Sequence, residues 1–187
     1  MRIVSGEARG VRLGQVPEGT RPTSDRVREG LFNALGQFFD GGTVLDLFAG
    51  TGALGIEALS RGCDRAVFVD QSGVAVRAIH ENLRLCGLEG RAEVLRSEAG
   101  RALGSLRSWE GFYLIFLDPP YRISRNKVES LLARLPGLLA AEGRIVLETN
   151  SEREAVLPGV GREYRYGGTR IVIYEPHQLD DLRETSP

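Results

Sequence analysis

The sequence contains few of the residue types that mark metal-binding or disulfide-rich proteins. It has two cysteines and two histidines among 187 residues. Cys63 and Cys86 form no CxxC pair, and His80 and His177 are far apart in the chain. Neither a disulfide framework nor a His and Cys metal site is therefore expected. Two isolated thiols are typical of a protein in a reducing compartment.

Long apolar runs are also lacking. Residues 1–7 show no apolar core of a signal peptide, and no later run approaches the length that crosses a membrane. The hydrophobic content of 42% and the charged content of 26% are those of a globular protein. We therefore expect a cytoplasmic, monomeric protein with no membrane partner, built from one domain and a small appendage.

Lysine is nearly absent, because Lys127 is the single lysine among 24 basic residues. The net charge of -1 neither indicates nor excludes nucleic acid, since a local basic patch can lie within a neutral total. Residues 1–28 carry six arginines against three acids. The amino-terminal part of the chain is thus a candidate basic patch.

Three parts can be distinguished along the chain. Residues 1–21 alternate short apolar pairs with glycines and predict a small β-hairpin extension. Residues 22–175 carry the pattern of a single domain, and residues 176–187 form a polar tail that we expect to be flexible. The domain begins with a helix that Thr23 or Ser24 caps, and its apolar stripe continues to Phe39.

Strand and helix patterns alternate in the middle of the chain. Because helices separate the strands, the alternation predicts an α/β fold with a Rossmann-like, mostly parallel sheet. Gly167 and Gly168 lie between two further strand patterns, which predicts an antiparallel hairpin at the end of a seven-stranded sheet. A turn is expected at Glu142–Gly143. The predicted strands are 43–48, 66–69, 92–95, 112–117, 144–147, 160–166 and 169–174, and the helices between them are 53–60, 72–86, 101–109 and 126–135.

A glycine-rich loop follows the first predicted strand of this alternation. Gly50, Gly52 and Gly55 form a GxGxxG pattern, in which the first two glycines allow a ligand to approach the backbone and the third allows close helix packing. Asp70 lies 20 residues after Gly50 and could accept hydrogen bonds from ribose hydroxyls. The pattern fits a nicotinamide cofactor or S-adenosylmethionine equally well.

Asp46, directly before the loop, favours S-adenosylmethionine. A carboxylate at this position would repel a pyrophosphate, whereas it would attract the sulfonium and the ammonium of S-adenosylmethionine. Asp46 could also accept backbone N–H groups of the loop, and the two roles are compatible.

Asp118-Pro119-Pro120-Tyr121 follows the apolar run 112–117 and reads as the end of a central strand. In an open α/β sheet, function lies at this carboxyl edge. The Asp118 carboxylate and the Pro119 carbonyl can accept both hydrogens of an exocyclic amine, and Tyr121 can stack on the base that carries it. We therefore expect a nucleobase amine as the methyl acceptor.

The three motifs together resemble class I S-adenosylmethionine-dependent methyltransferases that modify an exocyclic or amide nitrogen. Residues 21–33, RPTSDRVREGLFN, and residues 52–61, GALGIEALSR, make the chain similar to the RsmD family from Ile3 to about Tyr174. That family methylates a guanine N2 in bacterial small-subunit ribosomal RNA. The resemblance implies S-adenosylmethionine as cofactor, with this RNA or its assembly intermediate as partner.

The resemblance also implies roles for individual residues. The loop should line the methionine and ribose of the cofactor, and Asp70 should bind the ribose. Ser97-Glu98 departs from the N-D-A pattern of the family, which leaves open which side chain reads the adenine. The expected cofactor contacts are Asp46, Phe48, Gly50, Thr51, Gly52, Asp70, Gln71, Ser97, Glu98 and Thr23. The basic residues expected to contact RNA are Arg2, Arg9, Arg12, Arg122, Arg125 and Lys127.

Other functions compete with this one. An adenine-N6 methyltransferase acting on DNA or RNA would use the same tetrapeptide, and a nicotinamide-dependent oxidoreductase would use the same glycine pattern. A non-catalytic RNA-binding module could retain the fold, although the intact residues 118–121 argue against it.

Overall fold

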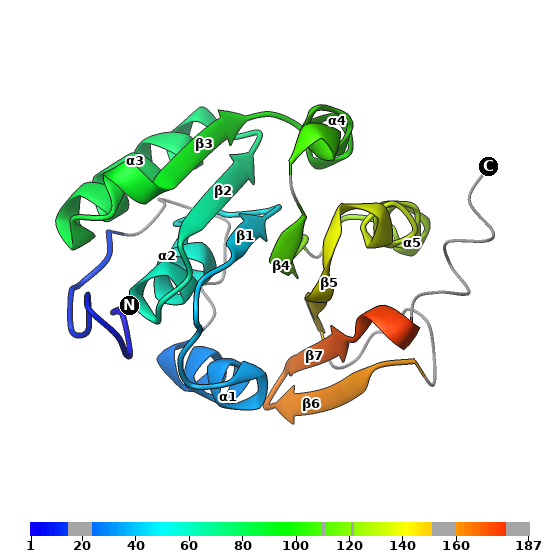
Figure 1. Ribbon diagram of the computed structural model, residues 1–187, viewed down its shortest axis with the longest axis horizontal. Helices are drawn as coiled ribbons and strands as arrows, with labels where there is room; N and C mark the ends of the chain where they lie inside the picture. The colour runs from blue at the N-terminus through cyan, green and yellow to red at the C-terminus, as the bar shows by residue number, and fades with distance from the viewer. Residues whose placement is uncertain (15–23, 110, 121, 151–159, 179–187) are drawn as a thin grey trace.

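The computed structural model describes residues 1–14, 24–109, 111–120, 122–150 and 160–178. In this part of the chain a seven-stranded sheet has the order β3-β2-β1-β4-β5-β7-β6 (Figure 1). The first five strands in this order are parallel, and β7 runs antiparallel to β5 and β6. The strands are β1 Thr43–Asp46, β2 Arg65–Asp70, β3 Ala92–Arg96, β4 Phe112–Leu117, β5 Leu139–Asn150, β6 Arg162–Tyr166 and β7 Thr169–Tyr174. The predicted α/β fold with an antiparallel carboxyl-terminal hairpin is confirmed.

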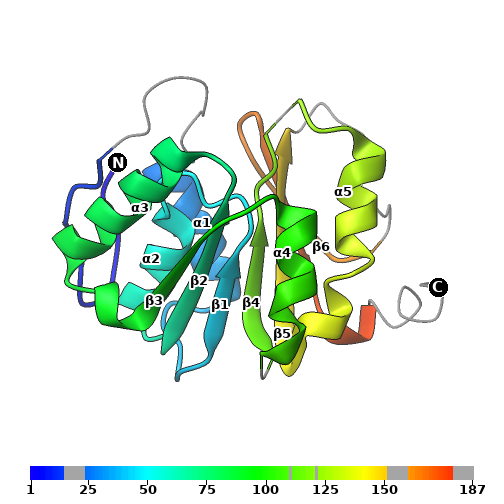
Figure 2. The ribbon, with the colours of Figure 1, turned by 90° about the horizontal axis from the view of Figure 1, so that it is seen from above.

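Helices cover both faces of the sheet (Figure 2). One face carries α1 Asp25–Leu35, α2 Ala53–Ser60 and α3 Gly73–Cys86, and the other carries α4 Ala99–Ser105 and α5 Arg125–Leu132. Successive strand residues alternate between the two apolar cores, so Val44 packs with the first layer and Leu45 with the second. The central strands are buried on both faces, which explains why their sequences are continuously apolar. Short 3-10 helices are η1 Glu89–Arg91, η2 Leu106–Ser108, η3 Pro136–Leu138 and η4 Pro176–Gln178.

The strand order of the sheet reverses between β1 and β4. From β1 the chain adds β2 and β3 on one side and then crosses to β4 on the other. Asp46 pairs in register with Phe116 of β4 and with Phe68 of β2, so Asp118 and Asp70 follow two residues later on either side. Carboxylates therefore end the neighbouring strands at the topological switch point, where ligands bind in open α/β sheets.

The amino-terminal segment, residues 1–14, turns back on itself and packs against the domain. The Ile3 N–H donates to the Val11 carbonyl at 3.0 Å, and an isolated antiparallel bridge joins Arg2 to Arg12. Ile3, Ala8 and Leu13 are buried in the core shared by α1, α2 and α3. The rest of the predicted extension, residues 15–21, lies outside the described residues.

Helix α1 ends earlier than its apolar stripe predicts. It stops at Leu35 because Gly36 adopts a φ of 114°, which no right-handed helix can continue. Phe38 consequently lies beyond the helix and is 65% exposed, whereas Phe39 packs edge-on against Phe32. The prediction that the helix continues to Phe39 was wrong.

The turn expected at Glu142–Gly143 is also absent, because β5 continues through both residues. The pairing of β4 with β5 instead shifts register between Phe112 and Leu114. Gly143 fits this irregularity, since a Cβ there would lie 2.4 Å from the Phe112 carbonyl oxygen. A glycine read as a turn signal thus lies at an irregularity within a strand.

Candidate active site

The glycine loop between β1 and α2 has the geometry that its sequence predicts. Gly50 and Gly52 adopt φ values of 55° and 78°, which favour glycine. Gly55 packs on the Phe68 ring, where an added Cβ would approach to 2.4 Å. At Gly50 an added Cβ would meet only the Phe48 carbonyl, at 3.9 Å, among the described atoms. The loop is therefore close to the sheet on one side and open to a ligand on the other.

Asp46 lies beneath this loop and is 1% exposed. Its Oδ2 accepts the N–H of Gly55, the third residue of α2, at 3.1 Å, so it fixes the start of the helix that follows the loop. Burial raises the pKa of Asp46 to about 7; the Gly55 hydrogen bond opposes this rise and the charge of Asp70 adds to it. Within the described residues it forms no ion pair.

Asp70 ends β2 beside the loop. Its Oδ2 accepts the Gly50 N–H at 2.9 Å, and its Oδ1 accepts the Ser72 N–H at 2.8 Å. The carboxylate thereby fixes both the glycine loop and the start of α3, and it retains lone pairs for a further donor such as a hydroxyl. Gln71 is exposed next to it, and its carbonyl accepts from the Arg96 Nε at 3.5 Å.

Ser97 and Glu98 follow β3 and start α4. The Glu98 carboxylate caps the helix by accepting the Arg101 N–H at 2.9 Å, so α4 begins at Ala99 rather than at Arg101. Lys127 Nζ lies 2.9 Å from the same carboxylate, and this contact holds the pKa of Glu98 below its ordinary value. An expected cofactor contact and an expected RNA contact are thus paired with each other.

Asp118 directly follows β4 and is half-buried. Pro119 is buried and Pro120 half-buried, and the Pro120 carbonyl accepts the Ile123 N–H at 2.9 Å in the turn that leads to α5. Because neither proline has an N–H, the strand ladder ends here and the chain leaves the sheet. Two expected site residues lie outside the described residues. They are Tyr121, the expected stacking partner of the base, and Thr23, an expected cofactor contact.

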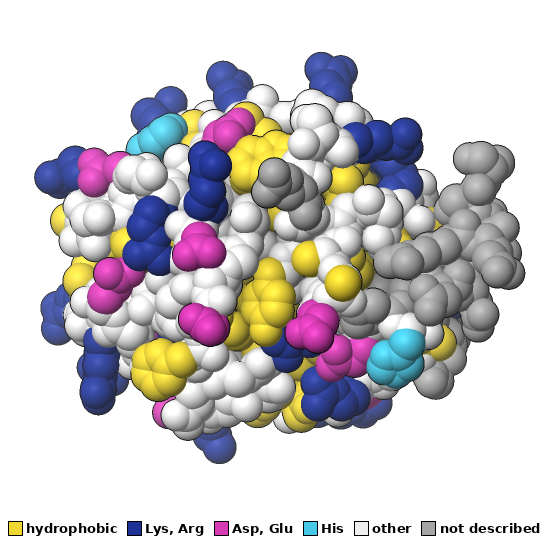
Figure 3. All heavy atoms as spheres, viewed as in Figure 1, with side chains coloured by type: hydrophobic (Ala, Val, Ile, Leu, Met, Phe, Trp, Pro, Cys, Tyr) yellow, Lys and Arg dark blue, Asp and Glu magenta, His cyan; other side chains and the backbone are white. Residues whose placement is uncertain are grey.

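The six basic residues expected to contact RNA are all exposed. Half of them are engaged in ion pairs with Asp25, Glu98 and Glu129. Basic side chains are spread around the visible face rather than gathered in one patch (Figure 3). The paired residues are Arg2, Arg125 and Lys127; those with no ion pair among the described residues are Arg9, Arg12 and Arg122.

Comparison with known proteins assigns the family. A sequence model described as "Conserved hypothetical protein 95" matches residues 1–175. The chain belongs to this family. It is 44% identical over 183 residues to YlbH of Bacillus subtilis, covering 94% of this chain and 98% of YlbH. It is 39% identical over 192 residues to ribosomal RNA small subunit methyltransferase D of Escherichia coli K12, covering 99% and 93% of the two chains.

A solved structure supports the fold. The hypothetical protein TTHA0928 of Thermus thermophilus superposes with a TM-score of 0.83 at 34% sequence identity. The match covers 94% of this chain and 99% of the Thermus chain. The likeness therefore extends over nearly the whole length of both proteins.

The sequence did not reveal a buried charged cluster that this family member carries under the amino-terminal segment. Glu57 of α2 is 0% exposed and accepts the N–H groups of Val4 at 2.8 Å and Ser5 at 3.0 Å. Arg61 Nε donates to its Oε1 at 2.8 Å, and Arg28 Nε lies 3.8 Å from its Oε2. Two buried arginines thus neutralise a buried glutamate that holds the chain's beginning.

Arg28 extends the cluster toward α1. Its guanidinium donates to the Arg2 carbonyl and lies 2.9 Å from Asp25 Oδ1. Arg28 belongs to residues 21–33 and Glu57 to residues 52–61, the two segments that carry the resemblance to the RsmD family. Those segments therefore meet in one cluster. The resemblance of both segments to the same family was the one sequence signal that linked them.

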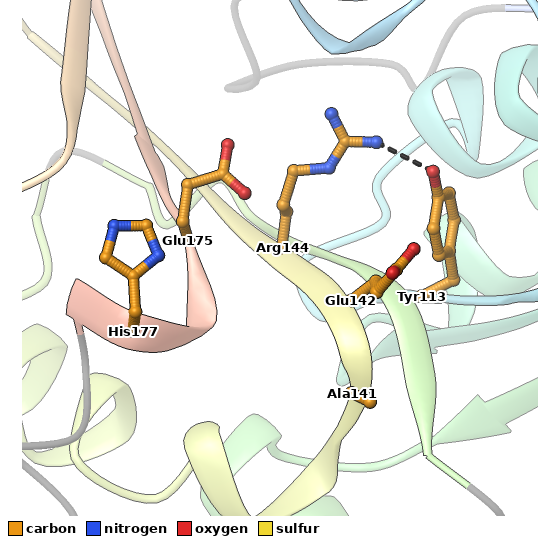
Figure 4. Close-up of a pocket in the computed structure, with 6 residues that line it drawn as sticks. All are labelled: Tyr113, Ala141, Glu142, Arg144, Glu175 and His177. Carbon is orange, nitrogen blue, oxygen red and sulfur yellow. Dashed lines mark hydrogen bonds between the residues drawn. The ribbon is translucent and has the colours of Figure 1, made fainter.

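A hollow of about 460 Å³ lies at the opposite, amino-terminal edge of β4 and β5 (Figure 4). Its Arg144 donates to the Tyr113 hydroxyl at 2.9 Å and to the Leu35 carbonyl at 2.8 Å, so the guanidinium ties α1 to the sheet. The hollow is remote from the carboxyl edge and has no part in the candidate site. It is lined by Tyr113, Ala141, Glu142, Arg144, Glu175 and His177.

The described part of the chain has neither a membrane-spanning helix nor a metal-binding cluster. No helix there is long and apolar enough to cross a membrane. In the same residues, no group of three or more His, Cys, Asp or Glu side chains is placed to hold a metal ion.

Proposed function

We propose that this chain is an S-adenosylmethionine-dependent methyltransferase that modifies the exocyclic N2 of a guanine in small-subunit ribosomal RNA. The observation that carries the proposal is Asp118, which follows the central strand β4 at the switch point where the glycine loop also begins. Family membership and the name of the Escherichia coli relative support the substrate class.

The loop suits S-adenosylmethionine better than a dinucleotide. Asp46 places a carboxylate beneath the loop, where an amine or a sulfonium is attracted and a pyrophosphate is repelled. The open backbone at Gly50 and the Asp70 carboxylate would hold the methionine and ribose portions. When bound, the cofactor supplies an electrophilic methyl group on its sulfonium.

Asp118 and Pro119 prepare the acceptor amine. The lone pair of a guanine exocyclic amine is delocalised into the ring, so the nitrogen is a poor nucleophile. An acceptor on each N–H favours the positive charge that develops on nitrogen and directs the lone pair toward the methyl group. Tyr121 remains the predicted stacking partner; stacking contributes about 1–3 kcal/mol per base, comparable to the cost of unstacking the target.

Arg9, Arg12 and Arg122 are the leading RNA contacts of the proposal. They are exposed and form no ion pair among the described residues, so phosphate binding would not have to displace a described carboxylate. Arg2, Arg125 and Lys127 would have to exchange a carboxylate for a phosphate. A ribosomal RNA substrate would place the protein in the cytoplasm, and we propose that it acts there as a monomer.

The test is methyl transfer to defined RNA substrates. Small ribosomal subunits, their assembly intermediates and naked ribosomal RNA, all from cells lacking this gene, would be incubated with the protein and methyl-labelled S-adenosylmethionine. The labelled RNA would then be digested and its nucleosides identified by mass spectrometry. D118A, which removes both acceptor oxygens of the side chain, is the inactive control.

We expect label in N2-methylguanosine, and D118A should abolish it, because the side-chain acceptor for the amine hydrogen is lost. Label in N6-methyladenosine would replace the guanine assignment with the adenine alternative. No label in any of the three substrates would overturn the substrate class, and calorimetry with NAD and S-adenosylhomocysteine would show whether the cofactor assignment falls too.

A further inference from the structure

Asn82 of α3 joins two parts of the chain that are far apart in sequence. It is 0% exposed. Its Nδ2 donates to the Thr51 carbonyl in the glycine loop at 2.8 Å, and its Oδ1 accepts the Gly14 N–H of the amino-terminal segment at 2.7 Å. A longer contact of 3.4 Å joins Nδ2 to the Gly14 carbonyl. One buried amide therefore bonds to both segments.

The bonding capacity of this amide is well matched to its surroundings. The oxygen accepts from one backbone N–H, and the nitrogen has two hydrogens for two backbone carbonyls. Loss of the amide would leave the part-buried Thr51 carbonyl without this donor, which destabilises the conformation that holds it. The position of Thr51 in the loop thus depends on Asn82.

We propose that Asn82 is a positioning residue that couples the glycine loop to the amino-terminal segment, so that a ligand on the loop also stabilises residues near Gly14. The inference rests on the proposed function, because it takes S-adenosylmethionine or its product as the ligand. Arg12, an expected RNA contact, lies two residues before Gly14. By linkage, placement of this segment and occupancy of the loop favour each other to the same extent.

A second anchor of the amino-terminal segment provides a matched control. Ser60 Oγ accepts the Ala8 N–H at 3.0 Å and donates to the Ser5 carbonyl at 2.6 Å. These bonds hold the same segment through the last residue of α2 and involve no atom of the glycine loop. S60A therefore loosens the segment, whereas N82A loosens the segment and also its connection to the loop.

The experiment measures S-adenosylhomocysteine affinity by calorimetry and exchange of the Gly14 amide by NMR in wild type, N82A and S60A. Wild type should bind, and binding should slow Gly14 exchange. N82A should bind about tenfold more weakly, with a raised KM for S-adenosylmethionine and a smaller change in kcat, and its Gly14 exchange should not respond to ligand. S60A should stay within about twofold of wild type in affinity and keep the response.

Different failures lead to different conclusions. Wild-type binding with no change in Gly14 exchange would overturn the coupling, and this measurement needs no variant to fold. Wild-type affinity in N82A, or an equal loss in S60A, would also overturn it while leaving the proposed function intact. Absence of binding by wild type would overturn the cofactor assignment and the coupling together.

Discussion

Asp46 and Glu57 are both buried carboxylates that accept backbone N–H groups, yet their surroundings differ. Glu57 lies between Arg28 and Arg61, and its two oxygens hold the amino-terminal segment. Asp46 lies under the glycine loop, accepts one N–H and forms no ion pair among the described residues. One acid is neutralised by the protein itself, and the other is not.

The difference separates a structural carboxylate from one that we propose binds a ligand. A buried charge without a cation costs stability, and burial accordingly raises the pKa of Asp46 to about 7. Such an arrangement is typical of a binding site, where a ligand supplies the missing positive charge. Glu57 already has its cations, so it has no comparable need of a ligand.

The largest effect is expected when the neutralised acid is changed. E57Q would leave two buried arginines facing a neutral amide and should lower the free energy of unfolding by about 3–5 kcal/mol. Urea denaturation monitored by circular dichroism measures this loss. Variant E81Q is the control, because Glu81 pairs with Arg84 on the exposed surface. A similar stability for E57Q and E81Q would contradict the structural role of the cluster.

Close packing of the amino-terminal segment should give the next largest effect. Gly6 and Gly10 adopt nearly the same φ, 83° and 85°, but a Cβ on Gly6 would lie 1.7 Å from the Ser60 carbonyl oxygen while one on Gly10 would contact no described atom within 4 Å. G6A should therefore lower the unfolding free energy by about 2–3 kcal/mol and G10A by about 1 kcal/mol. Equal losses in thermal unfolding would show that the segment is not tightly docked.

Removing the charge of Asp46 should raise the free energy of unfolding, whereas the two preceding changes lower it. Its raised pKa means that the folded state binds more protons than the unfolded state between about pH 4 and the folded value of about 7. The contribution of Asp46 to the free energy of unfolding of the wild type therefore falls as the pH rises across this window. D46N removes the titration and should be more stable than wild type by about 1–3 kcal/mol at pH 8, with little difference at pH 4. If the D46N variant is less stable than wild type at pH 8, Asp46 does not carry a buried charge that lacks a cation.

The smallest effect is expected at the exposed pair of Glu98 and Lys127. Both side chains are at least 40% exposed, so K127A should change the unfolding free energy by less than about 0.5 kcal/mol. Loss of the ammonium should nevertheless raise the pKa of Glu98 toward its ordinary value, which an NMR titration of the carboxyl carbon detects. An unchanged pKa would mean that the pair is not populated in solution.

Much of this architecture could be predicted from the sequence because it depends on local patterns. Apolar runs gave the buried strands, and the glycine pattern gave the loop whose third glycine packs on Phe68. The end of α1 was missed because the apolar stripe continues past Gly36, and only the backbone conformation of that glycine ends the helix.

The roles of Glu57 and Asn82 could not be predicted because their partners are distant in sequence. Glu57 bonds to residues more than 50 positions away, and Asn82 bonds to Gly14, 68 positions away. A lone polar residue in a helix pattern is normally read as solvent-exposed. The exception becomes visible only when the fold brings the amino-terminal segment against α2 and α3.

The most direct test of the contrast between the two acids is S-adenosylhomocysteine binding by D46N and wild type at pH 8, measured by calorimetry on samples of known stability. Because we propose that the Asp46 carboxylate attracts the amine of the ligand, D46N should bind at least about tenfold more weakly although it is the more stable protein. Equal affinity in a stabilised D46N would contradict the assignment of Asp46 to the cofactor.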